Sequence, residues 1–290
     1  MKRIARVFPR KTKASPDDRL AFFDKPPEHP LRIDEVHVSC TFTYDRSKAE
    51  ELCEQWEKVA PVKLGGPAYD DPGSEFEPGK YLKRGYVITS RGCPNKCWFC
   101  SVPKREGELR ELPIQEGHNV LDSNLLACSF RHFTKVIKML EKQKDRASFT
   151  GGLEAAILEW KHLELLWHLR PKRIFCAYDT PDDYDPLIEA GRKLRYANFT
   201  RSHLGCYVLI GWPGDKFSSA EDRLMKAWMA GFIPMAMLWR DPSGETPSRA
   251  WSRFQRAWAR PAITKVHVER RFIKWYRKKR KDGSLCRSSE

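Results

Sequence analysis

The chain has 290 residues, of which 41% are hydrophobic and 12% aromatic, so it is long and apolar enough to bury a globular core. Its formal net charge of +15 is unevenly distributed, because residues 249–281 hold thirteen Lys or Arg and one acidic residue, Glu269. No apolar run approaches the roughly 20 residues of a membrane-spanning helix, and the basic N-terminus lacks the apolar stretch of a secretory signal. We therefore expect no interaction with membranes.

The nine cysteines indicate a reducing compartment. Their number is odd and only three of them are clustered, which is not typical of a disulfide framework. We therefore expect a cytoplasmic protein in which the clustered cysteines bind metal.

The N-terminal quarter of the chain divides into two parts. Residues 1–30 are rich in Lys, Arg, Pro and Asp without a periodic apolar pattern, and we expect a basic arm on the surface. Residues 31–80 predict a truncated Rossmann-like βαβ fragment followed by a turn-rich linker. The fragment is too small to be a complete nucleotide-binding domain.

Within this fragment, residues 35–42 alternate like a strand, and residues 61–69 form a second strand that ends in Gly-Gly-Pro. The helix between them has Ser47 and Glu50 at the spacing of a capping box. Its apolar face is formed by Ala49, Leu52, Cys53, Trp56 and Val59.

From residue 81 to 245, strands and helices alternate regularly. The predicted strands are 85–90, 119–122, 147–150, 172–179, 205–211 and 233–239. Helical patterns fill 130–143 and 154–169, among others. Six βα units with apolar strands predict an α/β fold with a parallel sheet covered by helices. Because six units are fewer than the eight of a closed barrel, we expect an open, partial (β/α)6 TIM-like barrel with its chemistry at the carboxyl ends of the strands.

Directly after the first of these strands, RGCPNKCWFC places Cys93, Cys97 and Cys100 on one loop. Three thiolates can hold three corners of a 4Fe–4S cube and leave the fourth iron open to another ligand. A zinc knuckle that borrows a distant Cys or His is the alternative, although a structural zinc usually takes two separated pairs of ligands.

The C-x₃-C-x₂-C spacing, with the aromatic Phe99 before the last cysteine, resembles the radical S-adenosylmethionine superfamily over residues 81–241. The resemblance implies that S-adenosylmethionine chelates the open iron. One electron then yields a 5′-deoxyadenosyl radical, which abstracts hydrogen from a substrate. It also implies an electron donor, either a reductase or a protein of the flavodoxin or ferredoxin type.

Other strand ends resemble cofactor contacts of this superfamily. Gly151, Gly152 and Glu154 are similar to the Gly-Gly-Glu element that holds the amino group of S-adenosylmethionine. That element follows the second strand in the family, whereas here it follows the third. Asp122 and Asn124 are therefore an alternative pair for the amino group, with Glu154 at the ribose or the substrate. A structural alternative is that Asp122 and Glu154 cap the following helices.

Three further residues are candidates for the same cofactor. Asp179 ends the fourth strand, either as a ligand of the ribose or substrate or as part of an Asx turn before Pro181. Ile210 and Gly211 resemble the family's Ile-Gly segment, which packs against adenine.

The order of these motifs is similar to a branch of the superfamily whose longer members bind cobalamin. We expect no cobalamin here, because no Asp-x-His-x-x-Gly motif occurs. The scattered remaining cysteines predict no second cluster.

The C-terminal extension, residues 246–290, predicts basic helices with aromatic stripes. Such a segment suits the phosphate backbone of a nucleic acid. The alternative is that the aromatic residues pack on the core and the charges face solvent. The sequence thus predicts a radical S-adenosylmethionine enzyme of unidentified substrate, or else a nucleic-acid-binding protein with a structural or redox-sensing cluster.

Overall fold

The computed structural model describes residues 2–29, 32–71, 76–241 and 247–259, together with Thr264 and Val268. The chain divides into two compact units. Unit 1 comprises Met1–Ile174 and Asp241–Thr246, and unit 2 comprises Phe175–Arg240 and Pro247–Glu290. The fold is mixed α/β with parallel sheets. Among the described residues, no helix has the length and apolar character needed to span a bilayer.

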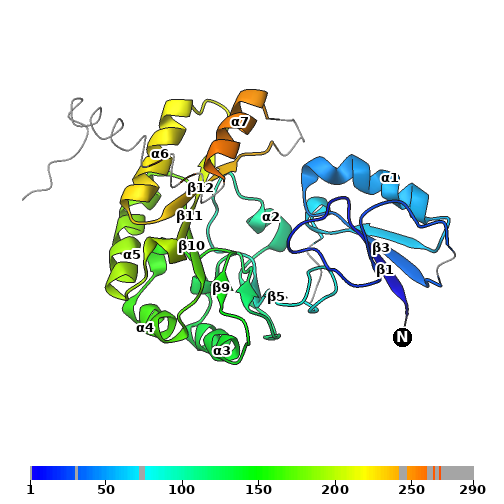
Figure 1. Cartoon of the computed structure of the whole chain (residues 1–290), viewed down its shortest axis with the longest axis horizontal. Coiled ribbons are helices and arrows are strands. Elements are labelled where there is room, and N and C mark those ends of the chain that lie inside the picture. The colour runs from blue at the N-terminus through cyan, green and yellow to red at the C-terminus, as the bar shows by residue number, and fades with distance from the viewer. Residues whose placement is uncertain are drawn as a thin grey trace, which may run out of the picture. The chain divides into compact units, whose positions relative to one another are not determined.

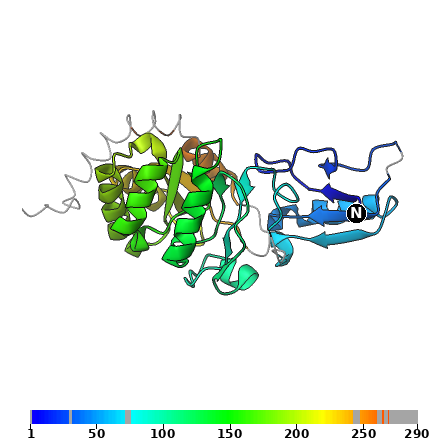
Figure 2. The same cartoon turned by 90° about the horizontal axis from the view of Figure 1, so that it is seen from below.

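Unit 1 begins with a four-stranded sheet in the order β2-β1-β3-β4, in which all neighbours are parallel. Its strands are β1 (Ile4–Val7), β2 (Ala21–Phe22), β3 (Glu35–Ser39) and β4 (Val62–Gly65). The helix α1 (Arg46–Trp56) joins β3 to β4 and lies along this sheet (Figures 1 and 2). Apolar side chains of the sheet and of α1 form one core. The expected βαβ fragment is therefore confirmed and extended by two strands.

The expectation of a surface arm at residues 1–30 is wrong. β1 lies between β2 and β3, and its Ala5 and Val7 side chains are fully buried. Arg6, between them, bonds the carbonyls of Gly79 and Lys80 and forms an ion pair with Asp18. A strand of four residues with an arginine inside it is too short to show an apolar period.

The predicted capping box at Ser47 is also wrong. With Ser47 as N-cap the helix would begin at Lys48, but α1 begins two residues earlier, at Arg46, after a 3-10 turn at Thr43–Asp45. Asp45 is the N-cap residue, but its carboxylate accepts two bonds from the Arg10 guanidinium, at 2.8 and 2.7 Å, rather than capping the helix. Of the predicted apolar face, Ala49, Leu52 and Trp56 are buried and Cys53 is partly buried, whereas Val59 lies beyond the end of α1.

The six predicted strands of the second half form one sheet in the order β12-β11-β10-β9-β8-β5. They are β5 (Tyr86–Val87), β8 (Asn119–Val120), β9 (Ser148–Phe149), β10 (Arg173–Tyr178), β11 (Leu204–Ile210) and β12 (Ile233–Leu238). The pairs β5–β8, β8–β9, β9–β10 and β11–β12 are parallel. The division between the two units falls within β10. Within this sheet, each strand thus lies beside the sheet strand that precedes it along the chain, as repeated βα units require.

The remaining helices connect or follow these strands. They are α2 (Val102–Glu106), α3 (Phe130–Glu141), α4 (Trp160–Leu169), α5 (Tyr184–Tyr196), α6 (Phe217–Met229) and α7 (Arg249–Trp258). In unit 1, α3 and α4 lie side by side (Figures 1 and 2). The helix expected at 154–169 is shorter than predicted, because a 3-10 turn precedes α4 and Glu159 forms the capping box with His162.

Only the first part of the basic extension lies within the described residues. In unit 2, α7 packs on β12, and its Trp251 and Phe254 rings lie against Phe217 of α6. Arg249, Arg253 and Arg256 of α7 are exposed. The aromatic stripe of α7 therefore packs on the core, while residues 260–290, Thr264 and Val268 excepted, lie outside the described part of the chain.

Candidate functional site

The three motif cysteines lie on one loop, between β6 (Ser90–Arg91) and α2. The antiparallel pairing of β6 with β7 (Arg110–Glu111) closes the base of this segment. Within the loop, the Cys100 N–H donates to the Cys97 carbonyl at 3.0 Å. Cys97 is exposed, and Cys93 and Cys100 are half-buried. The loop therefore presents thiols from a short segment that is fixed at both ends.

Gly92, directly before Cys93, is required by the shape of the loop. Its φ is +82°, a region that favours glycine, and a Cβ atom there would lie 2.2 Å from the Glu108 carbonyl oxygen. Its N–H donates to Glu106 Oε2 at 3.0 Å. A side chain at this position would displace the chain that leads into the first cysteine.

Glu106, at the end of α2, fixes the position of this loop through its buried carboxylate. Its buried carboxylate accepts bonds from Gly92 N at 3.0 Å, from Ser123 Oγ at 3.0 Å and from Arg105 at 2.8 Å, and it pairs with Arg91 at 3.3 Å. Burial alone would raise the pKa of Glu106, but these donors outweigh it and hold the pKa below its usual value. The carboxylate therefore stays ionised and joins the cysteine loop to the end of β8.

Asp122 follows β8 and points back toward the segment before the cysteines. It is buried, and its two oxygens accept from Thr89 N at 2.6 Å, Thr89 Oγ1 at 2.5 Å and Ser90 Oγ at 2.7 Å. Burial raises its pKa. Asp122 does not cap a helix, since Ser129 caps α3. The capping alternative is therefore wrong for this residue.

Asn124 and Glu154 meet beside the cysteine loop. The Asn124 side-chain nitrogen lies 2.5 Å from Glu154 Oε2 and 3.5 Å from Cys93 Sγ. Asn124 Oδ1 is buried, and among the described residues it has no hydrogen-bond partner. Glu154 makes no capping bond from its side chain, so the capping alternative is wrong here as well. These two residues thus place a carboxylate and a buried acceptor next to a motif cysteine.

The glycines before Glu154 bring the ends of β8 and β9 together. A Cβ atom on Gly151 would lie 2.3 Å from the Asp122 carbonyl oxygen. Gly152 has a φ of +107°. The lack of a side chain at Gly151 thus allows close packing between neighbouring strand ends.

Phe99, the aromatic residue of the motif, is half-buried. Its ring packs edge-on against Trp98, with 5.4 Å between the ring centroids. Trp98 is 63% exposed.

The other three predicted residues lie in unit 2. Asp179 accepts a bond from Leu209 N at 2.9 Å, and burial raises its pKa to about 6. Its side chain does not form the alternative Asx turn, because Asp183 accepts the N–H bonds of Asp179 and Thr180. Asp179 therefore fastens the end of β10 to β11.

Ile210 and Gly211 end β11 in the core of the same unit. The Ile210 side chain is fully buried. Gly211 has a φ of +75°, and its N–H donates to Asp215 Oδ2 at 2.7 Å. Asp215 also pairs with Arg223 at 2.7 Å.

The cysteine loop supplies three thiols as candidate metal ligands. Among the described residues, no group of three or more His, Cys, Asp or Glu side chains gathers around a point where one ion could bind. A cubane cluster takes its thiolates at separate corners, so its ligands do not converge on one atom. Three thiols on one loop, with the buried Asn124 amide beside one of them, fit such a group.

The residues that position the cysteine loop belong to no recognisable sequence motif. Thr89, Ser90, Glu106 and Ser123 were not predicted. Three acids, Glu106, Glu108 and Glu111, lie among Arg105 and Arg110 in the sequence, so no sequence signal distinguishes Glu106. No protein-family model matches this chain, and no curated protein matches its sequence. The assignment of a function therefore depends on the cysteine loop and its neighbours.

Proposed function

We propose that the chain is a radical S-adenosylmethionine enzyme, with one 4Fe–4S cluster held by Cys93, Cys97 and Cys100. When bound, the cluster and S-adenosylmethionine supply an electron and a 5′-deoxyadenosyl radical for hydrogen abstraction from a substrate that remains to be identified. The observation that carries the proposal is the meeting of Asn124 and Glu154 beside Cys93.

This pair suits the amino group of S-adenosylmethionine. An amino group that coordinates iron through its lone pair keeps two N–H donors and has no acceptor left. The Glu154 carboxylate and the buried Oδ1 of Asn124 are acceptors that lie next to the loop where the same molecule would chelate iron. A buried acceptor without a partner costs free energy, which an N–H donor of the bound amino group would recover.

Of the two alternatives for the amino group, we favour Asn124 with Glu154 over Asp122. The oxygens of Asp122 accept bonds from Thr89 and Ser90. Breaking these bonds would leave a buried carboxylate poorly compensated. Asp122 is instead a positioning residue, which fixes the segment before the cysteine loop.

The wider expectations follow from this assignment. Six consecutive strands in chain order support an open partial barrel, with the cysteine loop after its first strand. We expect a cytoplasmic protein that takes electrons from a reductase or from a flavodoxin- or ferredoxin-type donor. Asp179, Ile210 and Gly211 remain candidates for contacts to the ribose and the adenine.

The test is anaerobic reconstitution of the full chain, followed by dithionite, S-adenosylmethionine and chromatography for 5′-deoxyadenosine. We expect a brown protein that forms 5′-deoxyadenosine, and loss of both properties in Cys97→Ala. Cys53→Ala is the matched control, since Cys53 is half-buried on α1. Full iron content in Cys97→Ala would overturn the cluster assignment.

The second candidate function is nucleic-acid binding with a structural or redox-sensing cluster. It is favoured by the exposed Arg249, Arg253 and Arg256, which lie on one side of α7 at helical spacing. The same assay separates the two functions. A reconstituted cluster that yields no 5′-deoxyadenosine would favour this second candidate.

A further inference from the structure

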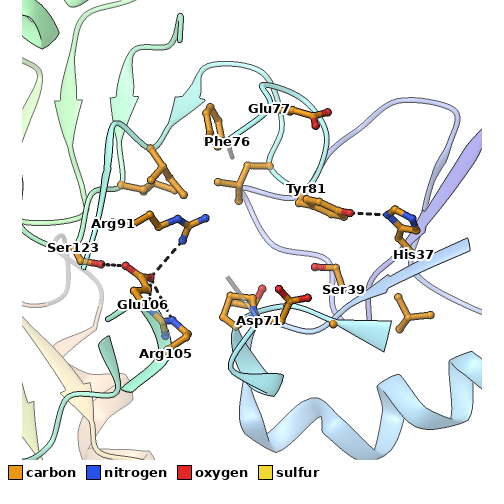
Figure 3. Close-up of a pocket in the computed structure, with 18 of the residues that line it drawn as sticks. His37, Ser39, Asp71, Phe76, Glu77, Tyr81, Arg91, Arg105, Glu106 and Ser123 are labelled. Atoms are coloured by element: carbon orange, nitrogen blue, oxygen red, sulfur yellow. Dashed lines mark hydrogen bonds and ion pairs between the residues drawn. The ribbon is translucent and has the colours of Figure 1, made fainter. Parts of the chain in front are cut away.

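A pocket of about 420 Å³ lies within unit 1 (Figure 3). One side of it is formed by the ends of β3 and β4, with Ser39 and Gly66. Phe76 and Tyr81 line it from the chain between β4 and β5, and the opposite side includes Glu106. Small-molecule pockets span about 300–1,000 Å³, so this one can enclose a compact organic ligand.

The pocket lies where open α/β sheets bind ligands. β3 and β4 are parallel neighbours, and the pocket is outside their carboxyl ends. Val36 and Val38 of β3 pack into the core that the sheet shares with α1. Because side chains alternate along a strand, His37 and Ser39 lie on the other face, from which they line the pocket. This face of β3 thus supplies polar groups to the pocket.

Two hydroxyl groups give this side of the pocket its hydrogen-bonding capacity. Neither Ser39 Oγ nor Thr41 Oγ1 has a hydrogen-bond partner among the residues that the structure describes. A Cβ atom on Gly66 would lie 3.2 Å from Ser39 Oγ, so a glycine here keeps the approach to this hydroxyl open. A hydroxyl both donates and accepts hydrogen bonds, so these two groups can bond a ligand group that does the same, such as an amide.

Aromatic and aliphatic side chains surround these hydroxyls. The Tyr81 hydroxyl lies 2.6 Å from His37 Nδ1, and the two rings stack with their centroids 6.1 Å apart. His37 therefore satisfies the polar end of Tyr81 and holds its ring in place. Phe76, Leu82 and Ile88 add apolar surface. A ligand with an apolar body can bury that body against these side chains.

The charged side chains of the pocket balance one another. The described lining residues include three cations and three acids, which are Lys63, Arg91, Arg105, Asp71, Glu77 and Glu106. Arg91 and Arg105 both pair with Glu106. Lys63 pairs with Glu35. An ionic ligand would lose its hydration here without meeting an excess of opposite charge, so the pocket favours a neutral one.

We propose that this pocket binds a neutral organic molecule with an apolar body and, at one end, a hydrogen-bonding group such as a carboxamide. The hydrogen-bonding group lies at Ser39 and Thr41, and the body lies beside Phe76 and Tyr81. This division follows the usual pattern of small-molecule sites, in which apolar walls enclose the ligand and a few polar groups orient it. The inference goes beyond the proposed function and requires neither the cluster nor S-adenosylmethionine.

The experiment is a titration of the full chain without cluster, followed by ligand-observed NMR, with four probes. Benzamide is neutral and has both the apolar body and the hydrogen-bonding end. Benzoate and benzamidine have the same shape with a negative and a positive charge, and acetamide lacks the body. We expect benzamide to bind at least tenfold tighter than each of the other three.

Two variants localise the site. Ser39→Ala should weaken benzamide binding about two- to tenfold, the loss expected for one neutral hydrogen bond. Tyr81→Ala should weaken it about fivefold or more, because the apolar body loses a contact. Ser47→Ala on α1 and Tyr196→Ala on α5 are the matched controls, since both side chains are exposed and lie outside the pocket.

The proposal is overturned if benzamide does not bind, or if benzoate, benzamidine or acetamide binds as tightly. It is also overturned if a folded Ser39→Ala or Tyr81→Ala variant binds benzamide as tightly as its control does. Circular dichroism of each variant shows whether it has folded. If Tyr81→Ala is misfolded, Ser39→Ala alone decides the location.

Discussion

The backbone N–H of Gly92 donates to the carboxylate of Glu106 at 3.0 Å, one residue before the first motif cysteine. Glu106 lies fourteen residues later in the chain, and the same carboxylate bonds Ser123 beyond β8. The cysteine loop is therefore positioned by a buried charge that links its start, its end and a neighbouring strand. This arrangement gives the loop a defined shape.

Replacing Glu106 by Gln should reduce the iron content after reconstitution. The amide keeps the shape of the side chain but removes the negative charge that pairs with Arg91 and Arg105, a loss of about 3–5 kcal/mol for a broken buried pair. Glu108→Gln is the control, because Glu108 is exposed between α2 and β7. Iron per chain and the melting temperature of both variants are the measurements. Unchanged iron and an unchanged melting temperature in Glu106→Gln would contradict this role.

Replacing Gly92 by Ala should disturb the loop more than replacing Gly107. Both residues have a positive φ, at +82° and +73°, so both substitutions strain the backbone by roughly 1–3 kcal/mol. Only at Gly92 does the new Cβ also meet a carbonyl oxygen, that of Glu108, whereas nothing lies within 4 Å at Gly107. We expect a lower melting temperature and less iron in Gly92→Ala than in Gly107→Ala. Equal melting temperatures and iron contents in the two variants would show that the contact between the new Cβ atom and the Glu108 carbonyl oxygen is relieved without loss of stability.

Glu154→Gln should weaken S-adenosylmethionine binding without loss of the cluster. A charge-assisted bond to the amino group is worth about 1.5–3 kcal/mol, so the dissociation constant should rise about tenfold or more. Equilibrium dialysis with the anaerobic reconstituted protein measures it. Glu164→Gln, exposed on α4, serves as the control. If the affinity is unchanged while the cluster absorbance persists, Glu154 does not contact the amino group.

Much of the fold could be predicted from the sequence, because apolar strands of the second half stand out between helical patterns. β1 could not be predicted, because Arg6 interrupts its four residues and finds its bonding partners at Gly79 and Lys80, more than seventy residues away. The helix cap at Ser47 was misplaced because Arg10 pairs with Asp45 across the fold. In the site, the cysteines have a readable spacing, whereas Glu106 acquires its role only when separate strand ends meet.

Asp179 should make the stability of the chain depend on pH. Burial raises its pKa to about 6, above the value of about 3.9 in an unfolded chain. Between these values the folded chain retains a proton that the unfolded chain has released, so the folded state is progressively destabilised as the pH rises from about 4 to about 6. In Asp179→Asn, the amide oxygen can still accept the Leu209 N–H bond without ionising.

We therefore expect Asp179→Asn to gain about 1–3 kcal/mol in free energy of unfolding, relative to the unchanged chain, between pH 4 and pH 7.5. Urea unfolding of both proteins at the two pH values measures this gain. An equal change in the free energy of unfolding between the two pH values in both proteins would contradict a raised pKa of Asp179 in the folded state.

The exposed arginines of α7 should carry nucleic-acid binding if the C-terminal extension has that role. Each phosphate contact of B-DNA contributes about 0.9 to the slope of log affinity against log salt concentration. Replacing Arg249, Arg253 and Arg256 together by Gln should thus lower the slope by up to about 2.7 and weaken binding at low salt. Titrations with duplex DNA and with tRNA at about 50 and 200 mM salt measure both quantities.

The matched control for this test lies on α3, where Arg131, Lys135 and Lys138 are exposed at the same helical spacing. Replacing these three by Gln removes the same charge from the chain but leaves α7 intact. A local binding surface predicts that only the α7 variant loses affinity. If both triple variants lose affinity equally, the overall charge attracts the nucleic acid. If neither does, the cations of α7 only face solvent, and small molecules and peptides become the substrates to search.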